Sequence, residues 1–137
     1  MNRKRAFIAF AAAFVFIFFF GFVWHGILTK PAYVEISNHW RSDPDFQSHF
    51  WVLVLGHAVI AFAFTCLYAS KVGTQCAGSG ASYGFVVGIL CSGAVLLRFA
   101  TEPLTTKILW MLIAGDLIMF TLMGALIGLI YRPLADR

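Results

Sequence analysis

The chain has 137 residues, 61% of them hydrophobic, a mean hydropathy of +0.84 and a formal net charge of +4. This composition excludes a soluble globular protein of this size, and the length leaves room for one domain. The positive charge does not indicate nucleic-acid binding, because the charged residues are confined to short segments between long apolar stretches.

Four apolar stretches dominate the sequence, at residues 6–28, 50–70, 79–99 and 108–131. A helix needs about 20 apolar residues to cross a hydrocarbon core of about 30 Å. The pattern therefore predicts an all-α integral membrane protein, a four-helix bundle that forms a single membrane domain over residues 1–137. Basic residues before the first stretch are also typical of a signal peptide. That stretch is longer than a signal sequence and no small-residue cleavage site follows it, so we expect it to remain as the first helix.

Charge and aromatic residues together predict the orientation of the spans. With the N-terminus inside, the inner segments hold six basic residues and the outer segments four, which favours cytoplasmic termini. The inner residues are Arg3, Lys4, Arg5, Lys71, Arg132 and Arg137, and the outer ones are Lys30, Arg41, Arg98 and Lys107. Tryptophans 24, 51 and 110 then lie at outer span ends and tyrosines 68, 83 and 131 at inner ends, as interfacial belts do.

The longest polar segment lies between the first two spans. Pro31 is a typical first-turn residue of a helix, and Tyr33, Ile36 and Trp40 recur at helical spacing. This pattern predicts a short interfacial helix in the first outer loop, lying at the membrane surface. Asp43 is then expected to cap the second span.

Small residues recur at four-residue spacing in the last two spans. Gly84 and Gly88 form one pair, and Gly124 and Gly128 form another. Such pairs allow two helix backbones to approach closely, which predicts a tight hairpin of spans three and four or one face of a homodimer. The first span instead carries phenylalanines around every face, which predicts broad exposure to lipid rather than a packed interior position.

The candidate functional cluster consists of four ionisable side chains near the outer face: His25, His57, Arg98 and Asp116. His57 and Asp116 each follow an outer-end tryptophan by six residues, or about 9 Å at the helical rise, so we expect them at the same depth. An unpaired ionisable group within a span costs several kcal/mol, which makes each a functional candidate. Three interpretations stay open: Asp116 pairs with Arg98 or His57 and stabilises the bundle, the cluster lines a solvated vestibule for a proton, cation or polar solute, or histidines bind metal or haem.

Catalytic signatures are absent from the sequence. It contains no glycine-rich phosphate loop, no nucleophile elbow and no Cys-x-x-Cys pair, and the histidine spacing matches no metal motif. Three cysteines provide no disulfide framework. The sequence therefore favours a non-enzymatic protein and requires no cofactor, while axial ligation of haem or a metal by His25 and His57 stays open.

Residues 24–28 read Trp-His-Gly-Ile-Leu, and the outer loop continues with Tyr33, His39, Trp40 and Arg41. Residues 124–133 read GALIGLIYRP. In these two segments the chain resembles small four-span bacterial inner-membrane proteins that are grouped as a domain of unknown function. The resemblance implies a bacterial inner-membrane location, and it adds Tyr33, His39, Trp40 and Arg41 to the candidate site residues.

These features together predict a small polytopic inner-membrane protein that acts as an accessory or assembly subunit or associates with itself. Its expected partners are the lipid bilayer and a homodimer or larger membrane complex, and no nucleic acid. The alternative is a minimal oligomeric channel or proton-coupled transporter that uses the outer His/Asp/Arg cluster. A haem- or metal-binding membrane protein is the third hypothesis.

Overall fold

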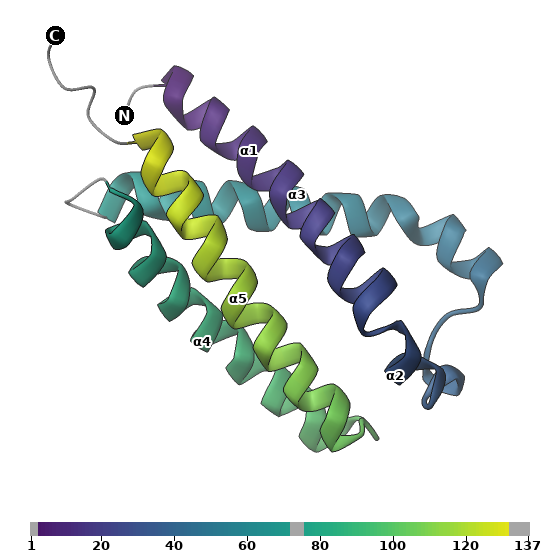
Figure 1. Ribbon diagram of the computed structural model, residues 1–137. Helices are drawn as coiled ribbons and strands as arrows, with labels where there is room; N and C mark the ends of the chain where they lie inside the picture. The colour runs from purple at the N-terminus through teal and green to yellow at the C-terminus, as the bar shows by residue number, and fades with distance from the viewer. Residues whose placement is uncertain (1–2, 72–75, 132–137) are drawn as a thin grey trace, which may run out of the picture.

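The structure, a computed structural model, describes residues 3–71 and 76–131, and every regular element in these two ranges is a helix (Figure 1). Within them, four helices are long and apolar enough to cross a membrane, at Lys4–Leu28, Asp43–Ser70, Ala77–Thr101 and Thr106–Tyr131. The predicted all-α architecture with four spans is therefore confirmed. Arg132 and Arg137 lie outside the described residues, as do the side chains of Arg3, His39 and Lys71.

The spans run up and down between two ends, which we name by their aromatic residues. The tryptophan end holds Trp24, Trp40, Trp51 and Trp110, and the tyrosine end holds Tyr68, Tyr83 and Tyr131. The elements in chain order are α1 (Arg3–Gly21), the π-helix η1 (Phe22–Leu28), α2 (Lys30–Val34), the 3-10 turn η2 (Ser37–His39), α3 (Asp43–Lys71), α4 (Ala77–Thr101) and α5 (Thr106–Tyr131).

The second span begins earlier than its apolar stretch. α3 starts at Asp43 rather than near residue 50, so its first turns are polar. Asp43 and Asp45 lie in the first turn, where carboxylates interact favourably with the positive end of the helix dipole. The apolar stretch predicts only the part of the helix that would lie in the hydrocarbon core, and the helix itself begins before that part.

The closest helix pair is the hairpin of α4 and α5. A Cβ added to Gly84 would collide with the carbonyl group of Phe120, and one added to Gly80 would collide with that of Gly124. Because the opposing atoms belong to the backbone, no side-chain rotation can make room for a methyl group. All four glycines of the sequence pattern line this contact, namely Gly84, Gly88, Gly124 and Gly128.

α1 contacts both α3 and α5 and lies beside α5 in Figure 1. Its Ala9, Ala13 and Ile17 recur at four-residue spacing and are fully buried, whereas Phe7 and Phe19 are exposed. Most of this span is not buried, but the expected broad exposure to lipid does not extend to this stripe. Small alanine side chains allow the neighbouring helices to approach, and Phe10, Phe14 and Phe16 pack at the edges of this core.

α3 crosses behind α1 at a wide angle, and its tryptophan end lies away from the α4–α5 pair (Figure 1). Near the tyrosine end, aromatic side chains connect α3 to that pair. The ring of Phe64 stacks on Phe120 with centroids 5.9 Å apart, and the ring of Tyr68 lies 5.8 Å from that of Tyr131. The bundle is therefore packed around aromatic residues at the tyrosine end, while α3 diverges from α4 and α5 toward the tryptophan end.

The segment between the first two spans docks onto the α4–α5 turn. Ala32 and Ile36 pack with Leu104 and Ile108 in a small apolar core. Lys107 Nζ lies 3.2 Å from Glu35 Oε1 and adds an ion pair to this contact. The predicted interfacial helix is thus divided into α2 and η2, and α2 packs against the turn between α4 and α5.

Candidate functional site

A π-helical turn interrupts the first span at its tryptophan end. The carbonyl of Trp24 accepts hydrogen bonds from the backbone N–H of Thr29 at 2.9 Å and from the Thr29 hydroxyl at 2.8 Å. The extra residue in the turn rotates Trp24 and His25 relative to the face that α1 buries. π-helical turns occur frequently at functional sites, and this one contains the Trp-His-Gly sequence noted above.

Trp24 joins this turn to α5. Its indole Nε1 donates a hydrogen bond to the carbonyl of Met111 at 3.2 Å, and its ring stacks on Phe20 at 5.6 Å. A Cβ on Gly115 would lie 3.0 Å from two ring carbons of Trp24, so only glycine leaves room for the indole here. Sequence reasoning missed Gly115, because it lies outside the four-residue glycine spacing.

Tyr33 of α2 is the polar centre of the tryptophan end. Its hydroxyl lies 2.8 Å from His25 Nδ1, and its ring meets Trp40 edge-on at 5.1 Å. Arg98 and Asp116 both lie close enough to act on Tyr33 electrostatically. Tyr33, in the segment between the first two spans, therefore contacts one member of the candidate cluster, His25, and lies within electrostatic reach of two others.

The Tyr33 phenol is kept protonated by its surroundings. Burial raises the pKa of Tyr33; the Thr29 hydroxyl and the Arg98 guanidinium oppose this increase, and the Asp116 carboxylate adds to it. A protonated phenol and a neutral imidazole can each donate or accept, so the tautomer of His25 determines which of the two donates in their hydrogen bond.

Asp116 is half-buried in α5, directly after Gly115. Among the described residues it forms no ion pair and no hydrogen bond, although it acts electrostatically on Tyr33 and on the thiol of Cys91 in α4. The expected pairing with Arg98 is not formed. Both Nε and Nη2 of Arg98 bind the Glu102 carboxylate, at 2.9 and 2.8 Å, because Glu102 directly follows the end of α4, four residues after Arg98.

His57 does not reach Asp116 either. Its Nδ1 donates to the carbonyl of Leu53 at 2.7 Å, and a Cβ on Gly21 would lie 3.3 Å from its Nε2. Its ring packs against Phe18 at 5.5 Å. Since Phe18 and Gly21 belong to α1, the imidazole lies against that helix and not against α5.

His25 and His57 are near enough to interact electrostatically, yet they do not fit an iron held between two axial imidazoles. One ring nitrogen of His57 is bound to its own helix and the other faces the backbone of Gly21. Ligation through Nε2 would require α1 and α3 to separate. Within residues 3–71 and 76–131, no group of three or more His, Cys, Asp and Glu side chains is arranged to hold a metal ion.

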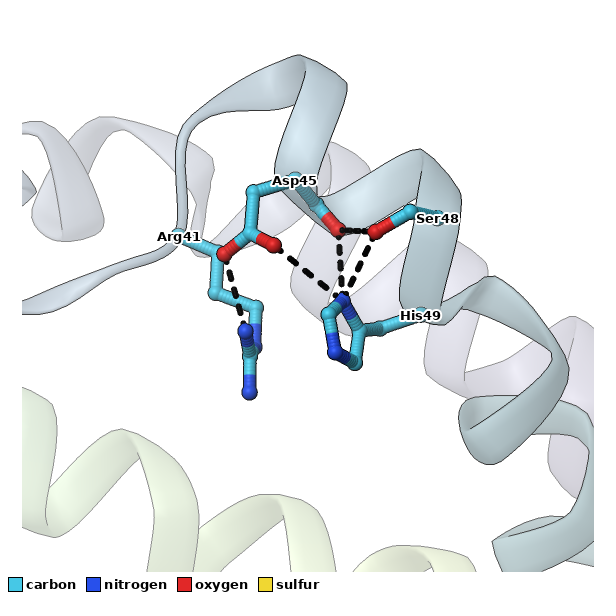
Figure 2. A network of polar contacts seen from close by, with 4 residues as sticks. All are labelled: Arg41, Asp45, Ser48 and His49. Atoms are coloured by element: carbon cyan, nitrogen blue, oxygen red, sulfur yellow. Dashed lines mark hydrogen bonds and ion pairs between the residues drawn. The ribbon is translucent and has the colours of Figure 1, made fainter.

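Another of the predicted site residues, Arg41, lies just before α3 and binds its first turn. Figure 2 shows the Asp45 carboxylate between Arg41 Nη1, at 2.8 Å, and His49 Nδ1, at 3.2 Å. The same His49 nitrogen lies 2.9 Å from the Asp45 carbonyl, to which the Ser48 hydroxyl donates at 2.7 Å. These contacts join residues four positions or fewer apart and are partly exposed, so they stabilise the polar start of α3 rather than forming a binding site.

Comparison with known protein families, curated proteins and solved structures gives no match to this chain.

Proposed function

We propose that the protein is a small multi-pass membrane transporter that binds and releases a proton at Asp116, at the tryptophan end of the bundle. The observation that carries this proposal is the isolation of Asp116 in a membrane span: among the described residues, no basic side chain pairs with it. A carboxylate in that position costs several kcal/mol unless it takes up a proton or water. The alternative role, a structural ion pair that stabilises the bundle, lacks its partner.

The neighbours of Asp116 support proton exchange. Asp116 acts electrostatically on the phenol of Tyr33 and the thiol of Cys91, and Tyr33 is hydrogen-bonded to His25. Phenol, imidazole and carboxyl groups can each donate or accept a proton, so together they provide a short relay from the polar loop into the bundle. A metal ion would require further ligands around the carboxylate.

The proposed setting is the bacterial inner membrane, with both termini in the cytoplasm. The bias of basic residues and the separation of tryptophan from tyrosine support this orientation. The tryptophan end, with Tyr33 and Asp116, then faces the periplasm. A proton would enter from the more acidic side of an energised membrane.

A hydrophobic carbodiimide tests the proposal, because this reagent modifies protonated carboxyl groups within membranes. Asp116 should form the adduct in native membranes, and the yield should fall as the pH rises. Asp116→Asn should abolish the adduct, whereas Asp43→Asn, at the exposed start of α3, should leave it unchanged. An Asp116 that remains unmodified at every pH, in protein that is folded, contradicts proton binding.

Transport is tested separately in liposomes that contain a pH-sensitive dye. An imposed proton gradient should dissipate faster with the wild-type protein than with Asp116→Asn, and Asp116→Glu should retain most of the rate. Equal rates for wild type and Asp116→Asn would leave a proton-binding protein without transport.

Self-association is a second candidate, favoured by the position of α3. The tryptophan-end half of α3 diverges from α4 and α5 and exposes Trp51, Leu55 and Val59 (Figure 1). A second copy of the chain could cover this apolar face and form a homodimer. Cysteines introduced at Leu55 should then cross-link within membranes, and cysteines at Val86 of α4 should not.

A further inference from the structure

A shallow apolar groove follows α1 where this helix lies beside α5 (Figure 1). It has a volume of about 690 Å³, and Leu126 of α5 lines it together with residues of α1. The groove follows from side-chain size, because the small Ala11 and Ala12 lie in the middle of its length and the bulky Phe7 and Phe19 lie at its two ends.

The groove extends over about one leaflet of a bilayer. It starts at Phe7, less than one turn after the span begins at Lys4, so one end lies near the membrane surface at the tyrosine end. From Phe7 to Phe19, α1 rises about 18 Å at the helical rise, close to the half-thickness of a hydrocarbon core, about 15 Å. A partner helix would cross the whole membrane and would need a groove along the full span. The length therefore fits a lipid acyl chain.

Two basic residues lie at the end of the groove nearest this surface. Residues three and four apart share a helix face, so Lys4 lies on the face of Phe7 and Ile8, and Arg5 lies beside it. Lys4 is exposed and Arg5 is half-buried. Lysine has three N–H donors and arginine has five, so both can bind a phosphate in addition to the contacts that they make within the protein.

We propose that this groove binds an anionic phospholipid of the leaflet at the tyrosine end. One acyl chain lies along Ala11, Ala12 and Val15, and the phosphate lies at Lys4 and Arg5. The apolar lining holds the chain by dispersion contacts, which do not distinguish one phospholipid from another. The two cations provide the selectivity, because each basic residue near the surface favours anionic lipid about fivefold.

The lipid site is separate from the proposed proton site. Along α5, Asp116 lies about 22 Å from Tyr131 at the helical rise, toward the other end of the bundle. The residues that line the groove carry no ionisable side chain. Lipid binding is therefore tested independently of proton binding at Asp116.

Photolabelling tests the site in phosphatidylcholine vesicles that contain a trace of phosphatidylglycerol with a diazirine in its acyl chain. Adducts mapped by mass spectrometry should concentrate on Ala11, Ala12 and Val15. Unlabelled phosphatidylglycerol should displace them, and unlabelled phosphatidylcholine should not. Val86 and Leu90, on the exposed surface of α4, are the control and should be labelled equally by diazirine forms of the two lipids. Equal labelling of the groove by these two forms would overturn the proposal.

Charge variants test the phosphate contact. Replacing both Lys4 and Arg5 with glutamine should lower the preference of the groove for phosphatidylglycerol about 25-fold, the product of two fivefold effects. Lys30→Gln is the matched control, because Lys30 is exposed at the tryptophan end, and it should leave the preference unchanged. An unchanged preference in the double variant would overturn the anionic site.

A bulky side chain in the groove tests the position of the acyl chain. Ala11→Phe should reduce the adducts at Val15, whereas Ala63→Phe, the same change on the exposed surface of α3, should not. With the native cysteines replaced by alanine, a cysteine at Val15 should not cross-link two copies of the chain. Such a cross-link would assign the groove to a second copy and overturn the lipid site.

Discussion

The indole of Trp24 lies directly against the backbone of Gly115. Its Nε1 donates to the carbonyl of Met111 one turn earlier, so the π-helical turn of the first span is attached to the last span immediately beside Asp116. Gly115 has no side chain, yet this contact makes it important for the position of the neighbouring Asp116. The position of Asp116 depends on how closely α5 approaches Trp24.

Gly115→Ala should displace Trp24 and destabilise the protein. The added methyl would lie within 3.0 Å of the indole ring, and overpacking of this kind costs about 1–3 kcal/mol. Thermal unfolding in detergent measures the loss, and tryptophan fluorescence reports the displacement. Gly56→Ala is the matched control, because a Cβ there meets nothing within 4 Å. Equal stability of the two variants would contradict the contact.

Gly84→Ala should be at least as damaging, because its methyl would meet the backbone of Phe120 and not a side chain. Alanine is about 1 kcal/mol more favourable than glycine within a helix. Overpacking costs about 1–3 kcal/mol. We expect a value toward the upper end here, because α4 and α5 would have to separate, so the net effect is destabilising. Gly93→Ala on the same helix faces open space and should be neutral or slightly stabilising. The unfolding temperatures of the two variants test this prediction. An unchanged unfolding temperature for Gly84→Ala would show that α4 and α5 are less closely packed than described.

The titration of Tyr33 should report its two charged neighbours in opposite directions. Its pKa lies above the usual value of 10.0, mainly through burial. Replacing Arg98 with Leu removes a charge that lowers the pKa and should raise it further, whereas Asp116→Asn removes a charge that raises it and should lower it. Phenolate absorbance, taken as the difference from Tyr33→Phe, measures both changes. Shifts in the same direction would show that one of the two does not act on Tyr33.

The raised pKa of Tyr33 also affects stability at alkaline pH. Because the folded state disfavours the phenolate, the contribution of Tyr33 is present below its unfolded pKa and is lost as the pH rises through the folded value. Wild-type protein should therefore lose stability above about pH 10 more steeply than Tyr33→Phe does. Chemical unfolding across this pH range tests the expectation, and identical profiles would contradict it.

The orientation in the membrane can be tested with single cysteines. With Cys66, Cys76 and Cys91 all replaced by alanine, a cysteine at Ser37 should react with an impermeant maleimide from the outside of intact cells. The second variant replaces only Cys66 and Cys91. Cys76, at the tyrosine end before α4, should react only after the membrane is permeabilised. The reverse pattern would place both termini outside.

Hydropathy and small-residue spacing predicted the parts of the fold that depend only on the order of residues along the chain. Four apolar stretches of sufficient length determined four helices, because a backbone in lipid must satisfy its own hydrogen bonds. The spacing of Gly84, Gly88, Gly124 and Gly128 indicated a close helix pair, because the absence of side chains on one face is visible in the sequence itself. It left the choice between a hairpin and a dimer to the structure.

The partners of the ionisable residues were decided only by the tertiary structure. Residue counting assigned His57 and Asp116 the same depth, but depth along a helix does not determine the face on which a side chain lies. The rotation of α3 turns His57 toward Gly21 of α1, and Arg98 binds Glu102 on its own helix. Asp116 instead acts electrostatically on Tyr33, which is distant in sequence but is brought toward α5 because α2 packs against the start of that helix. Such a relationship arises from helix rotation and loop packing, which no local pattern in the chain encodes.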